Sequence, residues 1–160
     1  MREQVDNVVK KALIFLMGLM LINVVWQVFS RYILGMPSTF TGELARFLLI
    51  WVSLLGGAYA SGQNMHLSIN LLPNQLGDRG RRKLSIFISV VIILFALLAM
   101  GLGGGRLVYI TYILGQSSPA LDIPLSYVYS VLPLSGFLIT YYKILDILEV
   151  RKPSTEPQNI

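Results

Sequence analysis

Long apolar blocks, separated by short polar connections, run along most of this chain. Four of them are long enough for a helix to cross the roughly 30 Å hydrocarbon core of a bilayer. They cover about residues 12–34, 41–60, 84–109 and 126–148. The pattern predicts an all-α integral membrane protein with four transmembrane helices, built as a single domain over residues 1–150.

Helix-breaking and helix-capping residues mark the ends of these blocks. Pro37 separates the first block from the second. Thr41 can cap the second helix, and Glu43 then falls in its first turn, where the helix dipole favours a carboxylate. Asp122 is expected to start or cap the fourth helix. Pro133 lies inside that helix and predicts a kink.

Two further segments do not fit a transmembrane helix. Residues 62–83 contain scattered apolar residues but are too short to cross, so we expect them to lie in the interface. His66 and Asn70 in this segment are expected to form interfacial hydrogen bonds. A metal site at His66 is less favoured, because the chain has one His and no Cys. Residues 151–160 are polar with two prolines, which predicts a disordered cytoplasmic tail.

The basic residues give the expected orientation. They gather in the N-terminal stretch, in residues 62–83 and at the C-terminal end, whereas residues 107–142 contain no Lys or Arg. With four spans, all three basic clusters lie on one side of the membrane. The positive-inside rule makes that side cytoplasmic, so both termini are expected there. The net charge of +5 is then explained by the basic residues that set the membrane orientation, and no nucleic-acid partner is expected.

Three charged residues are expected to lie at the outer ends of the first two helices. Glu43 and Arg46 share a face of the second helix, and Arg31 ends the first helix at similar depth. We favour a structural ion cluster of these residues over a carboxylate that carries protons or ions. Coupling carboxylates are more often near the midplane, and an acid beside two arginines stays ionised.

Small residues at helical spacing predict close contacts between helices, in this chain or with a partner. Two tryptophans inside the spans, rather than at the interfaces, also predict contact with protein. The helix-packing positions expected from these two signals are Gly56, Gly57, Ala60, Gly101, Gly105, Trp26 and Trp51.

The sequence carries no motif of an enzyme. It has no phosphate-binding loop, HExxH motif or nucleophile elbow, so we expect no enzymatic activity, cofactor or metal. It also has no duplicated halves and no broken-helix pattern with paired polar residues at midplane depth. An accessory or scaffold subunit fits best. The alternative is a self-sufficient four-helix exporter working as a homodimer, but the first span has no acid and the charge bias fixes one orientation.

One long run resembles a known family. RYILGMPSTFTGELARFLLIWVSLLGGAYASGQNMHLSINLLP is similar to the small membrane subunit (Q subunit) of tripartite ATP-independent periplasmic (TRAP) transporters. The matching residues are Arg31, Phe40, Thr41, Glu43, Arg46, Trp51, Gly56, Gly57, His66 and Asn70. Gly42-Glu43 departs from the family, which often has two adjacent acidic residues at this point.

The resemblance implies a subunit of a sodium-coupled secondary transporter in the bacterial inner membrane. In such systems a periplasmic substrate-binding protein captures an organic acid, and a large membrane subunit moves it. The substrate and sodium sites belong to the large subunit. The small subunit packs against it, widens its footprint in the lipid and helps to dock the binding protein. The substrate class implied is sialic acid or a C4-dicarboxylate.

Overall fold

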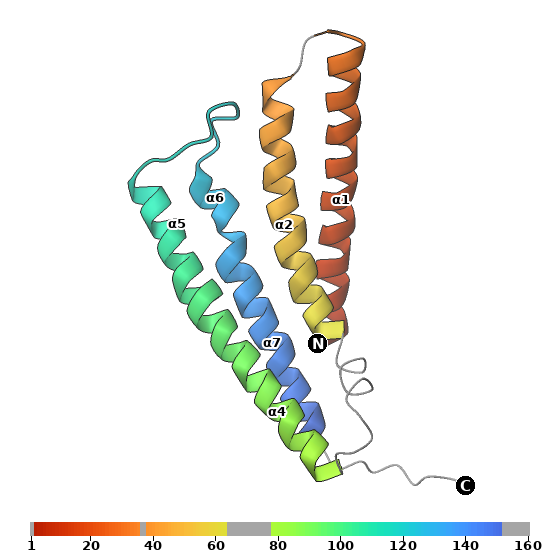
Figure 1. Cartoon of the computed structure of the whole chain (residues 1–160), viewed down its shortest axis with the longest axis vertical. Helices are drawn as coiled ribbons and strands as arrows, with labels where there is room; N and C mark the ends of the chain where they lie inside the picture. Colours follow the sequence, from red (N-terminus) through yellow and green to blue (C-terminus); the bar gives the residue numbers. More distant parts are fainter. Residues whose placement is uncertain (1, 36–37, 64–77, 152–160) are drawn as a thin grey trace, which may run out of the picture.

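The computed structural model describes residues 2–35, 38–63 and 78–151. Helix α1 spans Arg2–Tyr32 and α2 spans Thr39–Gln63. Helix α4 (Asp78–Phe95), the π-helix η1 (Ala96–Gly103) and α5 (Gly104–Ile113) follow one another as one long rod (Figure 1). Helices α6 (Leu125–Tyr129) and α7 (Val131–Arg151) complete the described chain.

This architecture confirms the predicted all-α membrane fold. In the part of the chain that the structure describes, four helical stretches are long and apolar enough to cross a membrane. They cover Arg2–Tyr32, Thr39–Gln63, Lys83–Ile113 and Leu125–Leu148. Helices α1 and α4 begin well before the expected spans, at Arg2 and Asp78, because their polar N-terminal residues continue the helix ahead of the apolar blocks.

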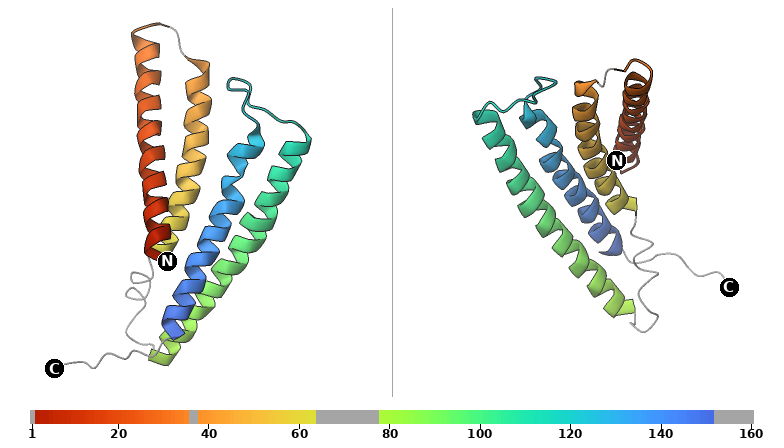
Figure 2. Two further views of the ribbon diagram at one scale, coloured as in Figure 1. Left: turned by 180° about the vertical axis from the view of Figure 1, so that it is seen from behind. Right: turned by 45° about the horizontal axis from the view of Figure 1, so that its top comes forward.

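The helices form two antiparallel pairs. Helix α1 packs on α2, and α7 packs on the rod of α4, η1 and α5, while α2 and α7 join the two pairs. Arg2 and Arg151 belong to what we call the terminal end of the bundle. The connections after α1 and after α5 form the opposite end, the loop end. The two pairs lie closest at the terminal end and diverge toward the loop end (Figure 2).

Three glycines allow the closest approaches between helices. A Cβ at Gly62 on α2 would lie 2.7 Å from the Tyr142 ring of α7. A Cβ at Gly104 would lie 2.8 Å from the Leu132 Cβ, and one at Gly136 would lie 2.9 Å from the Met100 Cβ in η1. Because real Cβ atoms do not come so close, only glycine fits at these helix contacts without a shift of the neighbours.

The fourth span is interrupted near its proline, as expected. Ser130 separates α6 from α7, three residues before Pro133. Proline has no N–H, so it cannot donate the helical hydrogen bond that would join these two turns. The expectation for Asp122 is wrong. Helix α6 begins at Leu125 after Pro124 and has no side-chain cap, and Asp122 lies in the loop with a positive φ of 51°.

The second helix begins at Thr39, two residues earlier than expected, so Thr41 is not its cap and Glu43 does not fall in its first turn. Thr41 is fully buried in its first turn, and its hydroxyl donates to the Ser38 carbonyl at 2.9 Å. The buried Asn23 of α1 donates from Nδ2 to the Thr41 carbonyl at 2.9 Å. Such a bond between two helices removes the cost of burying a polar side chain in a membrane span.

The predicted interfacial segment is bounded by α2, which runs to Gln63, and by α4, which begins at Asp78. His66 and Asn70 lie outside the described residues, as does the predicted tail beyond Arg151.

Candidate functional site

The C-terminal end of α2 is held by two cations from other helices. The Arg2 guanidinium donates to the Gly62 carbonyl at 2.6 Å, and Lys143 Nζ donates to the Ser61 carbonyl at 2.9 Å. The last four carbonyls of a helix have no partner within the helix, and the dipole makes this end negative. Arg2 and Lys143 therefore satisfy both the hydrogen-bonding and the electrostatic need of α2.

A buried carboxylate balances these cations. Asp146 is fully buried, and its Oδ2 lies 3.1 Å from Lys143 Nζ. Its Oδ1 lies 3.4 Å from Arg2 Nη2. Buried ions are tolerated only when they are paired, because removal of one partner leaves an uncompensated charge. Asp146 thus fixes two cations that in turn hold the end of α2.

A second acid completes this arrangement. The Tyr142 hydroxyl donates to Asp6 Oδ1 at 2.6 Å, and Gln63 Nε2 donates to Asp6 Oδ2 at 3.4 Å. We call Arg2, Asp6, Tyr142, Lys143 and Asp146 the terminal network. The terminal network joins α1, the end of α2 and α7. Its polar groups bond to one another, and such a network stabilises the packing of helices.

The residues of the terminal network were not predicted as a site from the sequence. Lys143 and Asp146 are one turn apart inside the fourth apolar block, and a charge in a membrane span is by itself a signal of a specific contact. Lys143 also belongs to the basic residues at the C-terminal end, which the positive-inside rule alone explains. Asp6 lies among polar residues before the first span, so nothing in the local pattern distinguishes it.

At the loop end, Glu43 connects the two helix pairs. Its Oε2 accepts hydrogen bonds from the Ser118 hydroxyl and from the Ala120 backbone N–H, the latter at 3.1 Å. Ser118 is almost fully buried. We call residues 115–124, the connection between α5 and α6, the strap. Glu43 therefore fastens the strap to the start of α2.

The strap has a defined backbone. Its turn is closed by the Ser118 N–H, which donates to the Ile123 carbonyl, and by the Asp122 N–H, which donates to the Ser118 carbonyl, both at 2.9 Å. The Leu125 N–H donates to the Gln116 carbonyl at 2.9 Å. Asp is one of the few non-glycine residues that tolerate the positive φ found at position 122. These bonds place the Ser118 and Ala120 donors together opposite Glu43.

The structure does not bring Arg31, Glu43 and Arg46 together as an ion cluster. Among the charged residues of the described ranges, no ion pair of 4 Å or less is found between Glu43 and either arginine. Both arginines are exposed. The Glu43 carboxylate takes neutral donors on the strap instead, so the link it makes is between α2 and the strap rather than between α1 and α2.

The small residues singled out from spacing lie in more open places than the three glycines of the helix contacts. A Cβ at Gly56 would meet only Leu13, at 3.9 Å, and a Cβ at Gly101 only a carbonyl of its own helix, at 3.7 Å. Gly57 and Gly105 have open space around them, and Ala60 is exposed.

The tryptophans also lie near the surface. Trp26 is 48% exposed and stacks on Phe29 with ring centroids 5.9 Å apart. Trp51 is half-buried. The contact with protein expected for Trp26 and Trp51, within the chain or with a partner, stays a prediction.

The bundle, with its polar contacts gathered at both ends and a largely apolar outer surface, defines a multi-pass membrane protein. Within the described residues, no group of three or more His, Cys, Asp or Glu side chains is arranged to hold a metal ion. The polar side chains brought together here join helices to each other, which is a structural task.

Comparison with known proteins identifies the family. Residues 20–152 match the family described as tripartite ATP-independent periplasmic transporters, DctQ component. The chain belongs to this family and is a small permease subunit of a TRAP transporter. The family is one of transporter subunits rather than of enzymes.

Three relatives of this chain are named for transporters of different solutes. The ectoine TRAP transporter small permease protein TeaB of Halomonas elongata is 34% identical over 142 residues, covering 85% of this chain and 72% of the relative. The sialic acid TRAP transporter small permease protein SiaQ of Vibrio cholerae is 29% identical over 103 residues, covering 63% and 60%. The C4-dicarboxylate TRAP transporter small permease protein DctQ of Rhodobacter capsulatus is 27% identical over 117 residues, covering 67% and 47%.

Proposed function

We propose that this chain is the scaffold subunit of a sodium-coupled, binding-protein-dependent importer in the bacterial inner membrane. It packs against the large membrane subunit, and the terminal end of the bundle faces the cytoplasm. The transported solute is an organic acid of the sialic acid or C4-dicarboxylate class. The observation that carries this proposal is the family match over residues 20–152, which includes residues 20–32 of the first span and the whole of the other three.

The contacts inside the bundle support a scaffold role. The charged groups of the terminal network satisfy one another and the end of α2, and Glu43 is occupied by donors of the strap. These groups hold helices in place. Helix α1 packs on α2 and leaves large apolar side chains exposed along its length, which suits contact with lipid or with a larger membrane protein.

The strap is the part of the chain that we propose to help dock the periplasmic binding protein. In the proposed orientation the loop end faces outward, so residues 115–124 meet the periplasm. Glu43 and the turn around Ser118 give the strap one conformation, and a preorganised loop loses less entropy when a partner binds.

Reconstitution tests the proposal. The chain, a TRAP large membrane subunit from the same organism and its binding protein are placed in liposomes, together and separately. Uptake of labelled sialic acid and C4-dicarboxylates is then measured with sodium or potassium outside. Ectoine is included because one relative is named for it. We expect sodium-dependent uptake only with all three proteins. Uptake of solute by this chain alone would refute the scaffold role and favour the alternative, a self-sufficient four-helix exporter.

A further inference from the structure

Helix α2 has two faces of different character. Its buried residues lie along one face and include Thr41, Leu48, Leu55, Ala58 and Gly62. On the opposite face, the residues exposed at spacings of three or four are Arg46, Leu49, Ser53, Gly57 and Ala60. We call these five residues the exposed α2 face. A surface of this kind on a membrane helix must be covered either by lipid or by protein.

The exposed α2 face is poorly suited to lipid. Leu49, at 51% exposure, is its one large apolar side chain. The remaining four positions are an arginine, a serine and two small residues. Helix α1 differs: Phe15, Leu21 and Ile22 are each at least 66% exposed on its surface. Membrane helices that pack on other helices use small and polar residues, because these allow close backbone approach and hydrogen bonding between helices.

Arg46 indicates the charge of the partner. It lies two helical turns, about 10 Å along the axis, from the first residue of α2. Glu43, its nearest acid on the same helix face, is taken by Ser118 and Ala120. A charged side chain at such a depth is generally paired with an opposite charge or reaches for the headgroups.

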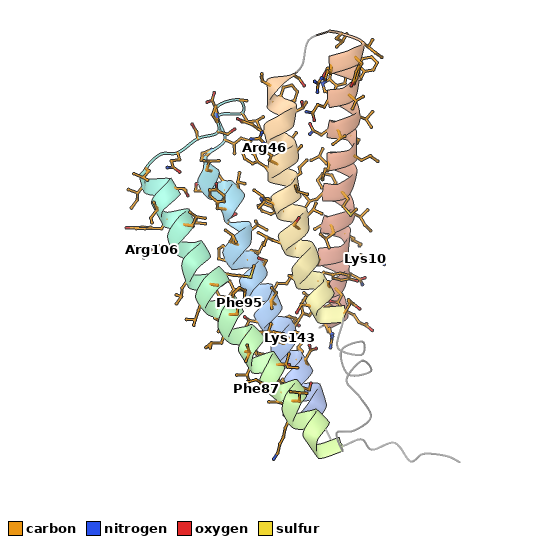
Figure 3. All side chains as sticks on the ribbon, viewed as in Figure 1. Lys10, Arg46, Phe87, Phe95, Arg106 and Lys143 are labelled. Atoms are coloured by element: carbon orange, nitrogen blue, oxygen red, sulfur yellow. The ribbon has the colours of Figure 1, made fainter. Side chains whose placement is uncertain are left out.

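Arg106 provides a comparison within the same chain. It lies two turns from the last residue of α5, as Arg46 lies two turns from the first residue of α2, and Figure 3 labels both side chains. Three exposed neighbours of Arg106 are large, since Leu102, Tyr109 and Ile113 are all more than 60% exposed, and the exposed Gly103 lies one turn away. The two arginines are equally far from their helix ends, but the side chains around them differ. More large apolar side chains are exposed around Arg106 than around Arg46, and such side chains favour lipid around Arg106.

We propose that the exposed α2 face packs against a transmembrane helix of the large subunit that carries a carboxylate opposite Arg46 and small residues opposite Gly57. This rests on the proposed function. A second copy of this chain is the wrong occupant, because a symmetric parallel pair across this face would set Arg46 against Arg46. A carboxylate on a different chain removes that repulsion and neutralises the arginine in a medium of low dielectric.

Matched glycine substitutions test the face. Gly57 and Gly18 each have nothing within 4 Å of an added Cβ, so the chain's own packing accommodates a larger residue at either. Gly18 lies on the exposed apolar surface of α1. With the chain and the large subunit co-expressed and the chain affinity-tagged, we expect Gly57→Leu to lower the co-purified large subunit about tenfold, and Gly18→Leu to leave it near wild type. Equal recovery in the two variants would overturn the proposal.

The arginines form the second matched pair. We expect Arg46→Glu to reduce recovery of the large subunit by about tenfold or more, because it places two carboxylates together. Arg106→Glu is expected to leave recovery within about twofold of wild type. Loss of the complex with Arg106→Glu and not with Arg46→Glu would place the interface on α5 and overturn the proposal. Circular dichroism of each purified variant verifies that the chain itself has folded.

Cross-linking distinguishes the occupants directly. The chain has no cysteine, so Ser53→Cys and Ile22→Cys each create a single attachment point for a photoactivated cross-linker. We expect Ser53→Cys to give a product with the large subunit and Ile22→Cys to give none. A product of two copies of this chain from Ser53→Cys would overturn the proposal. If the wild-type chain recovers no large subunit at all, it is the proposed function that fails, and the two failures are thereby separated.

Discussion

Asp146 and Arg2, at opposite ends of the described chain, lie 3.4 Å apart as an ion pair in which the carboxylate is fully buried. The pair brings the start of α1 against the last turns of α7. Because the Arg2 guanidinium also reaches the Gly62 carbonyl, this one residue connects three helices. The terminal end of the bundle is therefore fixed by charge, whereas the two helix pairs diverge toward the loop end, where Glu43 and the strap connect them.

Neutralising Asp146 should destabilise the bundle. Asp146→Asn leaves Arg2 and Lys143 with no carboxylate between them, and loss of one partner of a buried pair costs about 3–5 kcal/mol. We expect a marked fall in the thermal unfolding midpoint in detergent. Glu3→Gln, at an exposed position of α1, is the control and should change the midpoint little. Equal midpoints for the two variants would contradict a structural role for the terminal network.

Two glycines of α2 should respond oppositely to alanine. Gly62→Ala places a Cβ 2.7 Å from the Tyr142 ring, and overpacking of this kind costs about 1–3 kcal/mol. Gly57→Ala meets nothing within 4 Å and replaces a poor helix former, which gains up to about 1 kcal/mol. Unfolding of the chain alone in detergent measures both changes. A stabilising Gly62→Ala would show that α2 and α7 are farther apart than described.

Glu43 should control the order of the strap. Glu43→Ala removes the acceptor for Ser118 and Ala120, and hydrogen bonds to a charged group are worth about 1.5–3 kcal/mol each. We expect faster hydrogen exchange at the Ala120 amide and faster proteolysis within residues 115–124. Arg31→Ala is the control, because Arg31 is exposed and lies on α1. If Arg31→Ala increases exchange and proteolysis of the strap as much as Glu43→Ala does, the result would instead support the ion cluster of Arg31, Glu43 and Arg46.

The proposed orientation can be read from cysteine labelling, since the chain has no native cysteine. Ser117→Cys lies on the strap and Glu3→Cys on the first turn of α1, and both positions are exposed. A membrane-impermeant maleimide added to whole cells with a permeable outer membrane should label Ser117→Cys. Glu3→Cys should react only after the inner membrane is opened. The opposite labelling would invert the positive-inside assignment.

The apolar blocks were sufficient to predict the number of spans, because a membrane requires about 20 apolar residues per helix and few other folds do. The hydrogen-bond partners of polar side chains were harder to predict from the sequence. Arg46 is the nearest charged neighbour of Glu43 in sequence, yet the carboxylate bonds to Ser118 and Ala120, which a backbone turn at Asp122 brings within reach. Such a turn leaves no periodic signal.

The contacts of the terminal network were also not predictable from local sequence, because they join residues far apart in the chain. Asp6 and Tyr142 are joined by a hydrogen bond, but each is unremarkable in its own segment, and only the packing of α1, α2 and α7 brings them together. Small residues give a related ambiguity. Their spacing predicts which helix face can be approached closely but not by what, so Gly62 and Gly136 serve contacts inside the bundle while Gly57 is left open.

The most direct measurement is sodium-driven solute uptake in liposomes that contain the large subunit and the binding protein, with and without this chain. We predict that uptake depends on the chain, and that the chain without the large subunit moves no solute. Unimpaired uptake in its absence, or uptake by the chain alone, would contradict its role as a required scaffold subunit.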